Sequence, residues 1–362
     1  MSRLRVAVNT GGGDAPGLNA VIRAVVLSSL NRGWEVWGIR RGYGGLMGTD
    51  ELVQLTRESV RGITHLGGTI LGTTNRGSPF AYPVRQPDGS IITVDRSDEL
   101  IEAFRSRGFD ALIAIGGDGS LHMANELAKK GLPVVGVPKT IDNDLAATQV
   151  TFGFHTAVQT ASDALDKLHS TAESHERVMV VEVMGRHAGW IALFAGVSAT
   201  ADVILIPEIP FRMESVCDKI RSREAEGRPF SIVVVAEGAR PVDGEASFIR
   251  EAEPGAAGRL GGMAERVSGE IARCTGKETR SLVLGHLQRG GSPLAYDRLI
   301  SLRFGAAAVR CVADGLFGTM VALDPPDIRA VPLQEAVERI KTVPLDADVM
   351  LTARDLGISF GD

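Results

Sequence analysis

The sequence predicts an α/β fold built from two doubly wound, three-layer α/β/α domains with mostly parallel sheets. Three observations support this prediction: short apolar runs alternate with longer amphipathic segments, glycine clusters follow several of the runs, and the alternation starts again in the second half of the chain. Strands that alternate with helices form parallel sheets, because each crossover returns the chain to the same end of the sheet. The length of 362 residues exceeds the usual size of one hydrophobic core, so two domains are expected.

In the first half, two stretches with helical periodicity each follow an apolar run and a glycine turn. The first turn is GGGD at residues 11–14, with Pro16 close to the first helical turn, where its missing N–H costs nothing. The second turn is GGDGS at residues 116–120. The predicted strands are residues 4–9, 34–39, 110–115 and 132–137, and the predicted helices are residues 19–30 and a segment that ends at about residue 130.

The second half repeats the alternation, with predicted strands at 178–183, 203–207 and 231–236 and a predicted helix at 156–169. We expect one domain to comprise residues 1–153 plus about 288–338, and the other to comprise 154–287 plus about 339–362. Two segments are predicted to be peripheral. Residues 82–95 form a hairpin around Pro87-Asp88-Gly89, and residues 239–262, rich in glycine, proline and charge, form a mobile surface loop.

Composition narrows the classes of partner. The net charge of −5 gives no general attraction for nucleic acid, so none is expected as a partner. No apolar run approaches the roughly 18 residues of a membrane span, and the apolar stretch at the start is too short for a signal peptide. The cysteines Cys217, Cys274 and Cys311 are far apart, so we expect small buried hydrophobic residues outside any disulfide, in a reducing cytoplasm.

The two glycine turns could each bind phosphate. Backbone N–H groups at the start of a helix favour negative charge, although residues 11–14 lack the Lys-Ser/Thr ending of a Walker A loop and could equally form a turn without a ligand. The second turn carries Asp118, whose carboxylate would repel phosphate unless a hard cation lay between them. Asp118 is therefore a candidate magnesium ligand, and the alternative is that it caps the following helix.

The sequence PKTIDND at residues 138–144 places two acids, a lysine and a threonine at the end of a predicted strand. Ligands of α/β proteins bind at this end of the sheet. One aspartate could accept a proton from an attacking hydroxyl while the other helps to hold a metal, the division of labour that phosphoryl transfer requires. The second half adds cations at element ends, and arginine suits phosphate because its planar fork donates two hydrogen bonds at once.

Together these motifs resemble the 6-phosphofructokinase family. TGGGDAPGLNAVIR, IGGDGS, PKTIDND, HERVMVVEVMGRHAGW and ETRSLVLGHLQRGGSP stand in the family's order over nearly the whole chain. The resemblance implies transfer of the γ-phosphoryl group of MgATP to the 1-hydroxyl of fructose 6-phosphate, a glycolytic reaction. It also implies a homodimer or homotetramer with shared active sites.

The resemblance also implies a role for each matching residue. Asp142 would be the base, with an ordinary carboxylate pKa of about 3.9, and Thr140 and Asp144 would orient the hydroxyl and the metal. Arg186 would stabilise the transferring phosphoryl group. Asp118 would carry Mg²⁺. The donor site would be lined by Gly13, Arg76, Gly77, Gly116, Gly117, Asp118, Gly119 and Ser120. The sugar phosphate would be held by Met184, Gly185, Glu237, His286 and Arg289, and its 6-phosphate by Arg177 and Arg280 of a neighbouring subunit.

The resemblance leaves two phosphoryl donors open. Gly119 leaves room for the α-phosphate and ribose of ATP, where pyrophosphate-using members carry an aspartate. Lys139, in contrast, is the residue of the pyrophosphate users. We weight Gly119 more heavily, because an aspartate there excludes ATP by sterics and charge whereas a lysine tolerates it. Pyrophosphate-dependent fructose 6-phosphate 1-phosphotransferase remains the alternative.

Regulation and two remoter alternatives follow from the same residues. Arg23 matches an effector-binding arginine of bacterial ATP-dependent members, but Leu27 and His169 stand where others are expected, so control by ADP and phosphoenolpyruvate is predicted to be weak or absent. An NAD or lipid kinase would share only the GGDG turn. A silent regulatory subunit is disfavoured, because Asp118, Asp142 and Asp144 are all present.

Overall fold

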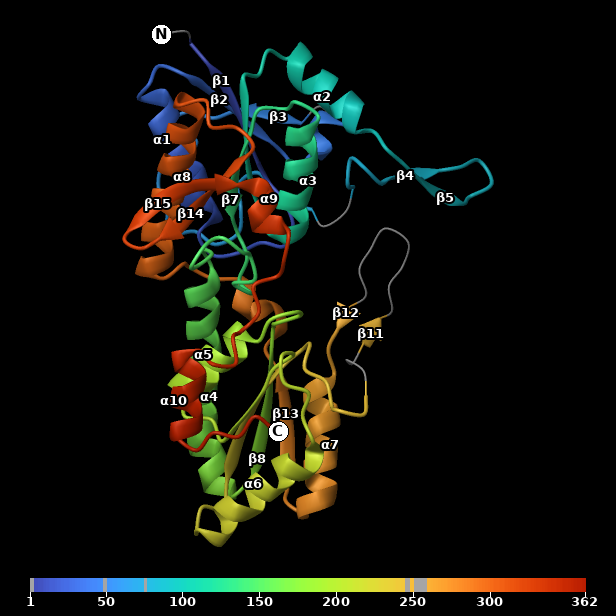
Figure 1. The fold of residues 1–362 in the computed structure, drawn as a ribbon, viewed down its shortest axis with the longest axis vertical. Coiled ribbons are helices and arrows are strands. Elements are labelled where there is room, and N and C mark those ends of the chain that lie inside the picture. The colour runs from blue at the N-terminus through green and yellow to red at the C-terminus, as the bar shows by residue number, and fades with distance from the viewer. Residues whose placement is uncertain (1–2, 48–50, 75–76, 245–247, 251–258) are drawn as a thin grey trace.

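The computed structural model describes residues 3–47, 51–74, 77–244, 248–250 and 259–362. Two sheets dominate it, one in the upper and one in the lower half of Figure 1. The larger sheet has the order β15-β14-β7-β6-β1-β2-β3. Its strands are β1 (Arg5–Thr10), β2 (Glu35–Ile39), β3 (Leu52–Gln54), β6 (Ala111–Gly116), β7 (Val134–Pro138), β14 (Thr319–Asp324) and β15 (Asp327–Pro332). The five inner strands are parallel and only the edge strands β3 and β15 run antiparallel.

Helices cover both faces of the larger sheet because its inner strands are apolar on both sides. Val6 and Val8 pack into a core cluster that includes α1 (Leu18–Leu30) and α8 (Ala295–Ala313). Ala7, which points to the opposite face, joins the cluster of α2 (Ser97–Ser106), α3 (Asp118–Lys129) and α9 (Leu333–Val337). Helices α1 and α8 approach so closely that a Cβ on Gly305 would meet Val21 O at 2.6 Å.

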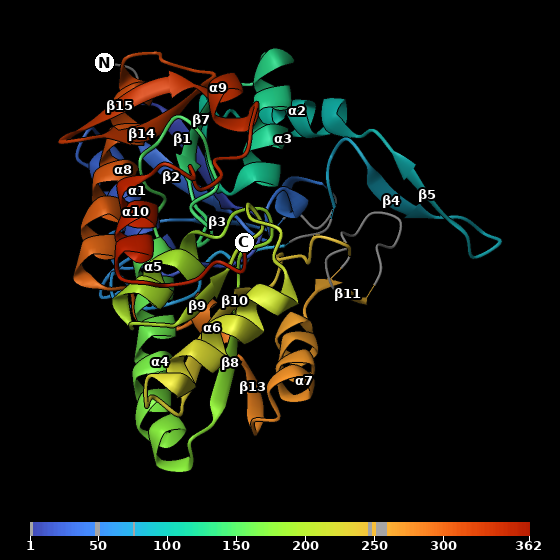
Figure 2. The same ribbon diagram turned by 60° about the horizontal axis from the view of Figure 1, so that its bottom comes forward.

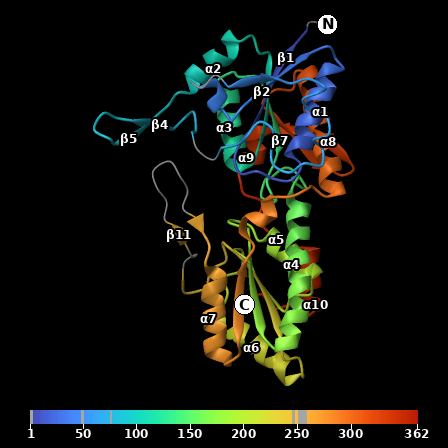
Figure 3. The ribbon, with the colours of Figure 1, turned by 180° about the vertical axis from the view of Figure 1, so that it is seen from behind.

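The smaller sheet is entirely parallel, in the order β13-β8-β10-β9. Its strands are β8 (Val178–Val183), β9 (Val203–Leu205), β10 (Ser231–Ala236) and β13 (Thr279–Val283). One face packs against α4 (Phe154–His175) and α5 (Trp190–Ser198), and the other against α6 (Met213–Ala225) and α7 (Met263–Thr275). Helices α1, α8 and α4 follow one side of the molecule, as the view from behind also shows (Figure 3), and one core cluster continues through both halves.

Shorter elements complete the description. The 3₁₀ helices are η1 (Gly44–Leu46) and η2 (Gly285–Arg289), and α10 (Asp348–Asp355) packs on α5. A hairpin of β4 (Tyr82–Arg85) and β5 (Ile91–Val94) projects from the body (Figure 2). The predicted loop at 239–262 contains an antiparallel pair, β11 (Phe248–Arg250) and β12 (Arg259–Leu260), while residues 245–247 and 251–258 of that prediction lie outside the described part.

The α/β class, the parallel sheets and the hairpin at 82–95 are confirmed. The helix predicted at 156–169 is longer, at Phe154–His175, and the strand predicted at 203–207 is shorter, at Val203–Leu205. Described strands of the larger sheet come from residues 5–138 and 319–332, and those of the smaller sheet from residues 178–283. The domain limits drawn from the sequence stay a prediction.

The expectation of cysteines without disulfides is wrong for one pair. Cys217 of α6 and Cys274 of α7 form a disulfide with Cα atoms 6.4 Å apart, and Cys311 is free and buried. The two partners are 57 residues apart in the chain, so their spacing gave no signal. They meet because α6 and α7 pack side by side on one face of the smaller sheet. None of the described helices combines the length and the apolar character needed to span a membrane.

Candidate active site

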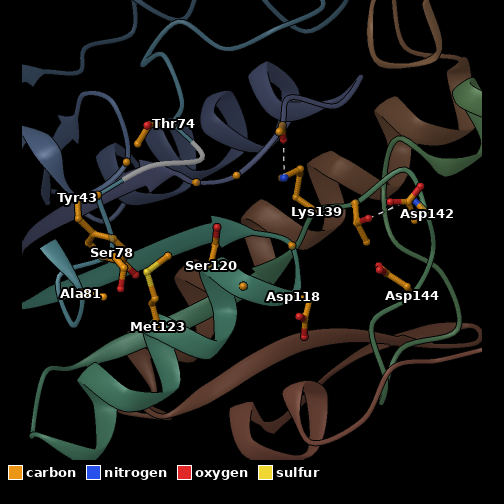
Figure 4. A pocket seen from close by; sticks show the side chains of 18 of the residues that line it. Tyr43, Thr74, Ser78, Ala81, Asp118, Ser120, Met123, Lys139, Asp142 and Asp144 are labelled. Atoms are coloured by element: carbon orange, nitrogen blue, oxygen red, sulfur yellow. Dashed lines mark hydrogen bonds between the residues drawn. The ribbon is translucent and has the colours of Figure 1, made fainter. Parts of the chain in front are cut away.

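A cavity of about 700 Å³ opens where β1, β6 and β7 end at the same edge of the larger sheet. Each strand leads directly into one of the predicted motifs, so the parallel topology brings together segments more than a hundred residues apart. Figure 4 shows Asp118, Ser120, Lys139, Asp142 and Asp144 around this cavity. The predicted site residues that line it are Gly13, Gly77, Gly117, Asp118, Gly119, Ser120, Lys139, Thr140, Asp142, Asp144 and Arg289.

The turn after β1 requires glycine, because side chains from other motifs approach its backbone too closely to leave room for a Cβ atom. A Cβ on Gly11 would lie 2.6 Å from Ser120 Oγ, and one on Gly13 would lie 2.8 Å from Arg289 Nη1. The Lys139 ammonium donates a hydrogen bond to Gly13 O at 2.5 Å (Figure 4). The turn therefore packs against hydroxyl and cationic groups that suit phosphate oxygens.

The second glycine turn begins helix α3. Gly117 is the N-cap residue, and no side chain caps the helix, so the alternative role of Asp118 as a helix cap is not what the structure shows. Burial, followed by the nearby charge of Asp144, raises the pKa of Asp118. A Cβ added to Gly119 meets nothing within 4 Å, so this position opens into the cavity. The helix start thus offers backbone N–H groups with a carboxylate beside them.

The loop after β7 is tightly held. The Asp142 backbone N–H donates to Thr140 Oγ1 at 3.1 Å, and Thr151 Oγ1 donates to Thr140 O at 2.6 Å. Asn143 adopts a left-handed conformation, with φ of 51°, and its side-chain oxygen accepts a hydrogen bond from the Thr151 N–H at 3.1 Å. The loop fixes its two aspartates through the backbone.

Asp142 does not have the ordinary pKa that the sequence suggested. Burial, and then the charge of Asp144, raises its pKa to about 6, while Arg289, Lys139 and Arg186 act in the opposite direction. Removal from water disfavours the charged form of a carboxyl group, which the sequence alone could not reveal. Burial and the neighbouring Arg289 lower the pKa of Lys139 to about 8.

The same loop has room for a cation. Asp142 Oδ1 and Asp144 Oδ1 are buried and have no hydrogen-bond partner among the described residues. Within the described ranges, no group of three or more histidine, cysteine or acidic side chains could hold a metal by itself. Mg²⁺ needs no such group, because it usually keeps several waters and binds one or two carboxylates plus substrate phosphates. The orphaned Oδ1 of Asp144 and the carboxylate of Asp118, which lines the same cavity, therefore fit a magnesium ion bound together with a phosphorylated donor.

The smaller sheet supplies a second group of predicted residues. Glu237, after β10, lies beside Met184, Gly185 and Arg186, after β8: its N–H donates to Val183 O at 2.9 Å, and the Gly238 N–H donates to Gly185 O at 3.1 Å. Burial, and then Asp142 and Glu182, raises the pKa of Glu237 to about 7, and Arg289 and Arg186 oppose that rise. Arg186 and Glu237 are thus within electrostatic range of Asp142.

Gly116, the last residue of β6, does not line the cavity itself. Three further predicted residues lie away from the cavity and from the second group, and one is not described. Arg177 directly precedes β8. Arg280, on β13, stands opposite Met179 in the parallel register, near the start of β8. Both arginines therefore lie at the opposite end of β8 from Arg186. Both form ion pairs with Glu278. His286 is exposed on η2. Arg76 lies outside the described residues.

The sequence prediction missed one side of the cavity. Tyr43, Ser78, Ala81 and Met123 line it, together with Pro83 and Ile91 of the β4–β5 hairpin. These residues carry no phosphate-binding signature, and the hairpin was predicted to be peripheral. The signal available was the hairpin itself, an insertion between the first two glycine turns. The cavity therefore has a polar end near Lys139 and Asp118 and a more apolar end near the hairpin.

Comparisons with known proteins agree with this geometry. The Phosphofructokinase family model matches residues 5–312. The chain is 55% identical to the ATP-dependent 6-phosphofructokinase of Chloroflexus aggregans, over 99% of this chain and 98% of that protein. It is also 52% identical to the pyrophosphate–fructose 6-phosphate 1-phosphotransferase of Amycolatopsis methanolica, over 94% of this chain and 96% of that protein.

A solved structure shows the same likeness in three dimensions. Pichia pastoris phosphofructokinase in the T-state superimposes with a TM-score of 0.79 and 32% identity, over 93% of this chain and 36% of that longer chain. The family match extends over most of the chain and includes each of the strand ends that build the cavity. On these grounds, the chain belongs to the phosphofructokinase family.

Proposed function

We propose that this protein is a 6-phosphofructokinase that transfers the γ-phosphoryl group of MgATP to the 1-hydroxyl of fructose 6-phosphate, giving fructose 1,6-bisphosphate in glycolysis. The observation that carries the proposal is the pair of the half-buried Asp142 and the buried Asp144, set between a glycine-lined phosphate cavity and the arginines of the smaller sheet. Phosphoryl transfer asks a protein mainly to position the two substrates and neutralise charge.

In this mechanism Asp142 accepts the proton of the sugar's 1-hydroxyl as the new P–O bond forms. Thr140 orients that hydroxyl, and Arg186 stabilises charge on the transferring group. Met184, Gly185, Glu237, His286 and Arg289 hold the sugar phosphate. On the donor side, Gly13, Arg76, Gly77 and residues 116–120 hold the phosphates. Asp118, assisted by Asp144, would hold Mg²⁺, which neutralises phosphate charge when it is bound.

The choice of ATP rests on the two ends of the cavity. Gly119 opens into free space, and the apolar side at Met123, Pro83 and Ile91 suits a nucleotide base better than it suits pyrophosphate. Lys139 and the Amycolatopsis relative favour pyrophosphate. Because the Lys139 ammonium is already bonded to Gly13 O, we place it at the phosphates that both donors share, where it does not exclude ATP.

We further propose a cytoplasmic homodimer or homotetramer whose active sites are shared. Arg177 and Arg280 lie too far along β8 and β13 to serve their own subunit's Asp142, so each would reach the 6-phosphate bound by a neighbour. The edge strand β13 exposes Leu282 and Val283, at 39% and 52%, which supports a covered surface there. The division into a donor domain (1–153 plus about 288–338) and a sugar-phosphate domain (154–287 plus about 339–362) belongs to the same proposal.

The test is formation of fructose 1,6-bisphosphate by the purified protein with Mg²⁺, comparing ATP with pyrophosphate and using Asp142→Ser as the inactive reference. Product with ATP alone supports the proposal in full. Product with pyrophosphate alone would reverse the donor assignment and make Lys139 decisive. Absence of product with either donor, or full activity of the Asp142→Ser protein, would refute the assigned reaction or the assigned base.

A further inference from the structure

A short segment between α9 and α10 crosses the junction of the two sheets and touches the loop that carries Asp142. It is drawn in red in Figure 1, descending from α9 to α10. Ile340 forms an antiparallel bridge with Leu145, and the Lys341 N–H donates to Asp144 O at 2.8 Å. The backbone of this segment therefore lies directly against the end of the 140–144 loop.

The Lys341 side chain adds three hydrogen bonds to the same region. Its ammonium donates to Asn143 Oδ1 at 2.8 Å, to Thr148 O at 3.0 Å and to Gln149 O at 3.1 Å. These bonds use all three donors of an ammonium group, and bonds from a charged donor are stronger than neutral ones.

Of the three acceptors, the side-chain oxygen of Asn143 has the most direct effect on the loop that carries Asp142 and Asp144. Asn143 stands between the two aspartates and adopts the left-handed conformation that costs most residues energy. Its side-chain oxygen is held from two sides, by the Thr151 N–H and by Lys341 Nζ. Because Asp142 Oδ1 and Asp144 Oδ1 have no hydrogen-bond partner among the described residues, the direction of both carboxylates depends on this backbone turn.

The other end of the segment is attached to the smaller sheet's half. Lys341 O accepts a hydrogen bond from Trp190 Nε1 at 2.9 Å, and Glu208 Oε1 accepts one from the Val343 N–H at 2.8 Å. Trp190 begins α5, which follows the turn that carries Arg186. One residue thus contacts both the loop of the proposed base and the helix that follows the proposed phosphoryl-stabilising arginine.

We infer that Lys341 is a positioning residue for the reaction. Through Asn143 and the Asp144 carbonyl it fixes the 140–144 loop, and it holds this loop in a constant position relative to Arg186 on the other half of the molecule. This inference rests on the proposed function for the identity of the base. It concerns a residue far along the chain from every motif that the sequence singled out. Displacing a reacting group by about 1 Å can cost about a hundredfold in rate, so the effect of the lysine should appear in kcat.

The first experiment compares Lys341→Met with the wild-type protein, using whichever donor supports turnover. We expect kcat to fall roughly 10- to 100-fold, with a smaller rise in the KM for the donor through Asp144, because the Lys341 ammonium donates to residues 143, 148 and 149 and not to the glycine turns that bind the donor. Lys130→Met is the matched control. The Lys130 side chain is partly buried and donates to Ser97 Oγ at 2.6 Å and to Asp98 Oδ1 at 3.0 Å, but it follows the end of α3 that lies away from the cavity. It should lower Tm without changing kcat.

A double-mutant cycle separates positioning from general stability. Glycine at position 143 tolerates the left-handed backbone but lacks the side-chain acceptor, so Asn143→Gly should lower kcat several-fold by itself. This variant still tests the inference if Lys341→Met fails to fold. In the Asn143→Gly background, the fold-decrease in kcat caused by Lys341→Met should be at least about threefold smaller than in the wild type, because the two side chains act together. Equal losses in both backgrounds, an unchanged kcat in Lys341→Met, or an unchanged kcat in Asn143→Gly would each overturn the inference. A wild-type protein inactive with both donors would instead refute the proposed reaction.

Discussion

At the scale of single residues, burial decides the chemistry of Asp142. A general base must be ionised, and burial raises the pKa of this carboxyl group to about 6. A raised carboxyl pKa means that the active form is complete above that value and is lost as the pH falls through it. We therefore expect kcat/KM for fructose 6-phosphate to decline about tenfold for each pH unit below about 6.

The control for this pH profile is Glu237→Gln. Glu237 also has a raised pKa, of about 7, and lies in electrostatic range of Asp142. If Asp142 sets the acid limb, the limb stays at about the same pH in the Glu237→Gln protein, because a carboxyl group with a pKa of about 7 is already mostly neutral at pH 6. Disappearance of the limb in that variant would assign it to Glu237 instead.

Gly119 allows a direct test of donor choice. A side chain there enters open space in the cavity without clashing with the protein, so Gly119→Asp should fold normally. Its carboxylate would occupy the nucleotide path and repel the phosphates, and we expect kcat/KM for ATP to fall at least about a hundredfold, with pyrophosphate use retained or gained. Gly119→Ala, which adds only a methyl group to the helix, is the control and should keep most ATP activity. Full ATP activity in Gly119→Asp would contradict the donor site described above.

At the scale of elements, the β4–β5 hairpin presents two different faces. Pro83 and Ile91 line the cavity, whereas Ile92, the next residue along β5, points to the other face. Both isoleucines are well exposed, at 62% and 45%, so neither contributes much to the stability of the fold. Substitutions on the two faces of the hairpin can therefore test whether a nucleotide base lies against it.

Replacing Ile91 by serine should raise the KM for ATP roughly fivefold, because the loss of a partly buried isoleucine contact costs about 1 kcal/mol. The KM for fructose 6-phosphate should stay constant. Ile92→Ser is the matched control on the opposite face and should leave both constants unchanged. Equal behaviour of the two variants in steady-state kinetics would mean that the hairpin does not contact the donor.

Elements also show how far sequence reasoning reaches. The predicted strands at 178–183 and 231–236 agree with the observed strands to the residue, because predominantly apolar, valine-rich runs between turns have few alternatives. The cavity-lining motifs after β1, β6 and β7 were found because glycine and acid clusters at strand ends carry a chemical signal. The hairpin's contribution, the Cys217–Cys274 pairing and Lys341 could not be found in this way. Each depends on contacts between segments that are distant in sequence and that only the packing of helices brings together.

At the scale of the whole molecule, the separation of Arg177 and Arg280 from Asp142 predicts complementation between inactive subunits. A protein with Asp142→Ser and one with Arg280→Ala should each be nearly inactive. If sites are shared in a dimer, co-expressed mixtures should recover about a quarter of the wild-type activity, because about half of the dimers are mixed and each mixed dimer restores one of its two sites. Purified mixed dimers, selected by two different tags, that remain inactive would contradict the shared site.

The larger sheet and its helices are built from two segments far apart in the sequence, and this separation has a consequence for biosynthesis. Helix α1 packs against α8 so closely that Gly305 admits no side chain, yet α8 ends at Ala313, long after β7 ends at Pro138. At about 5–20 residues per second, a ribosome takes roughly 9–35 s to cover that distance. During this time the apolar face of α1 has no partner helix, so the nascent chain is a natural client for chaperones.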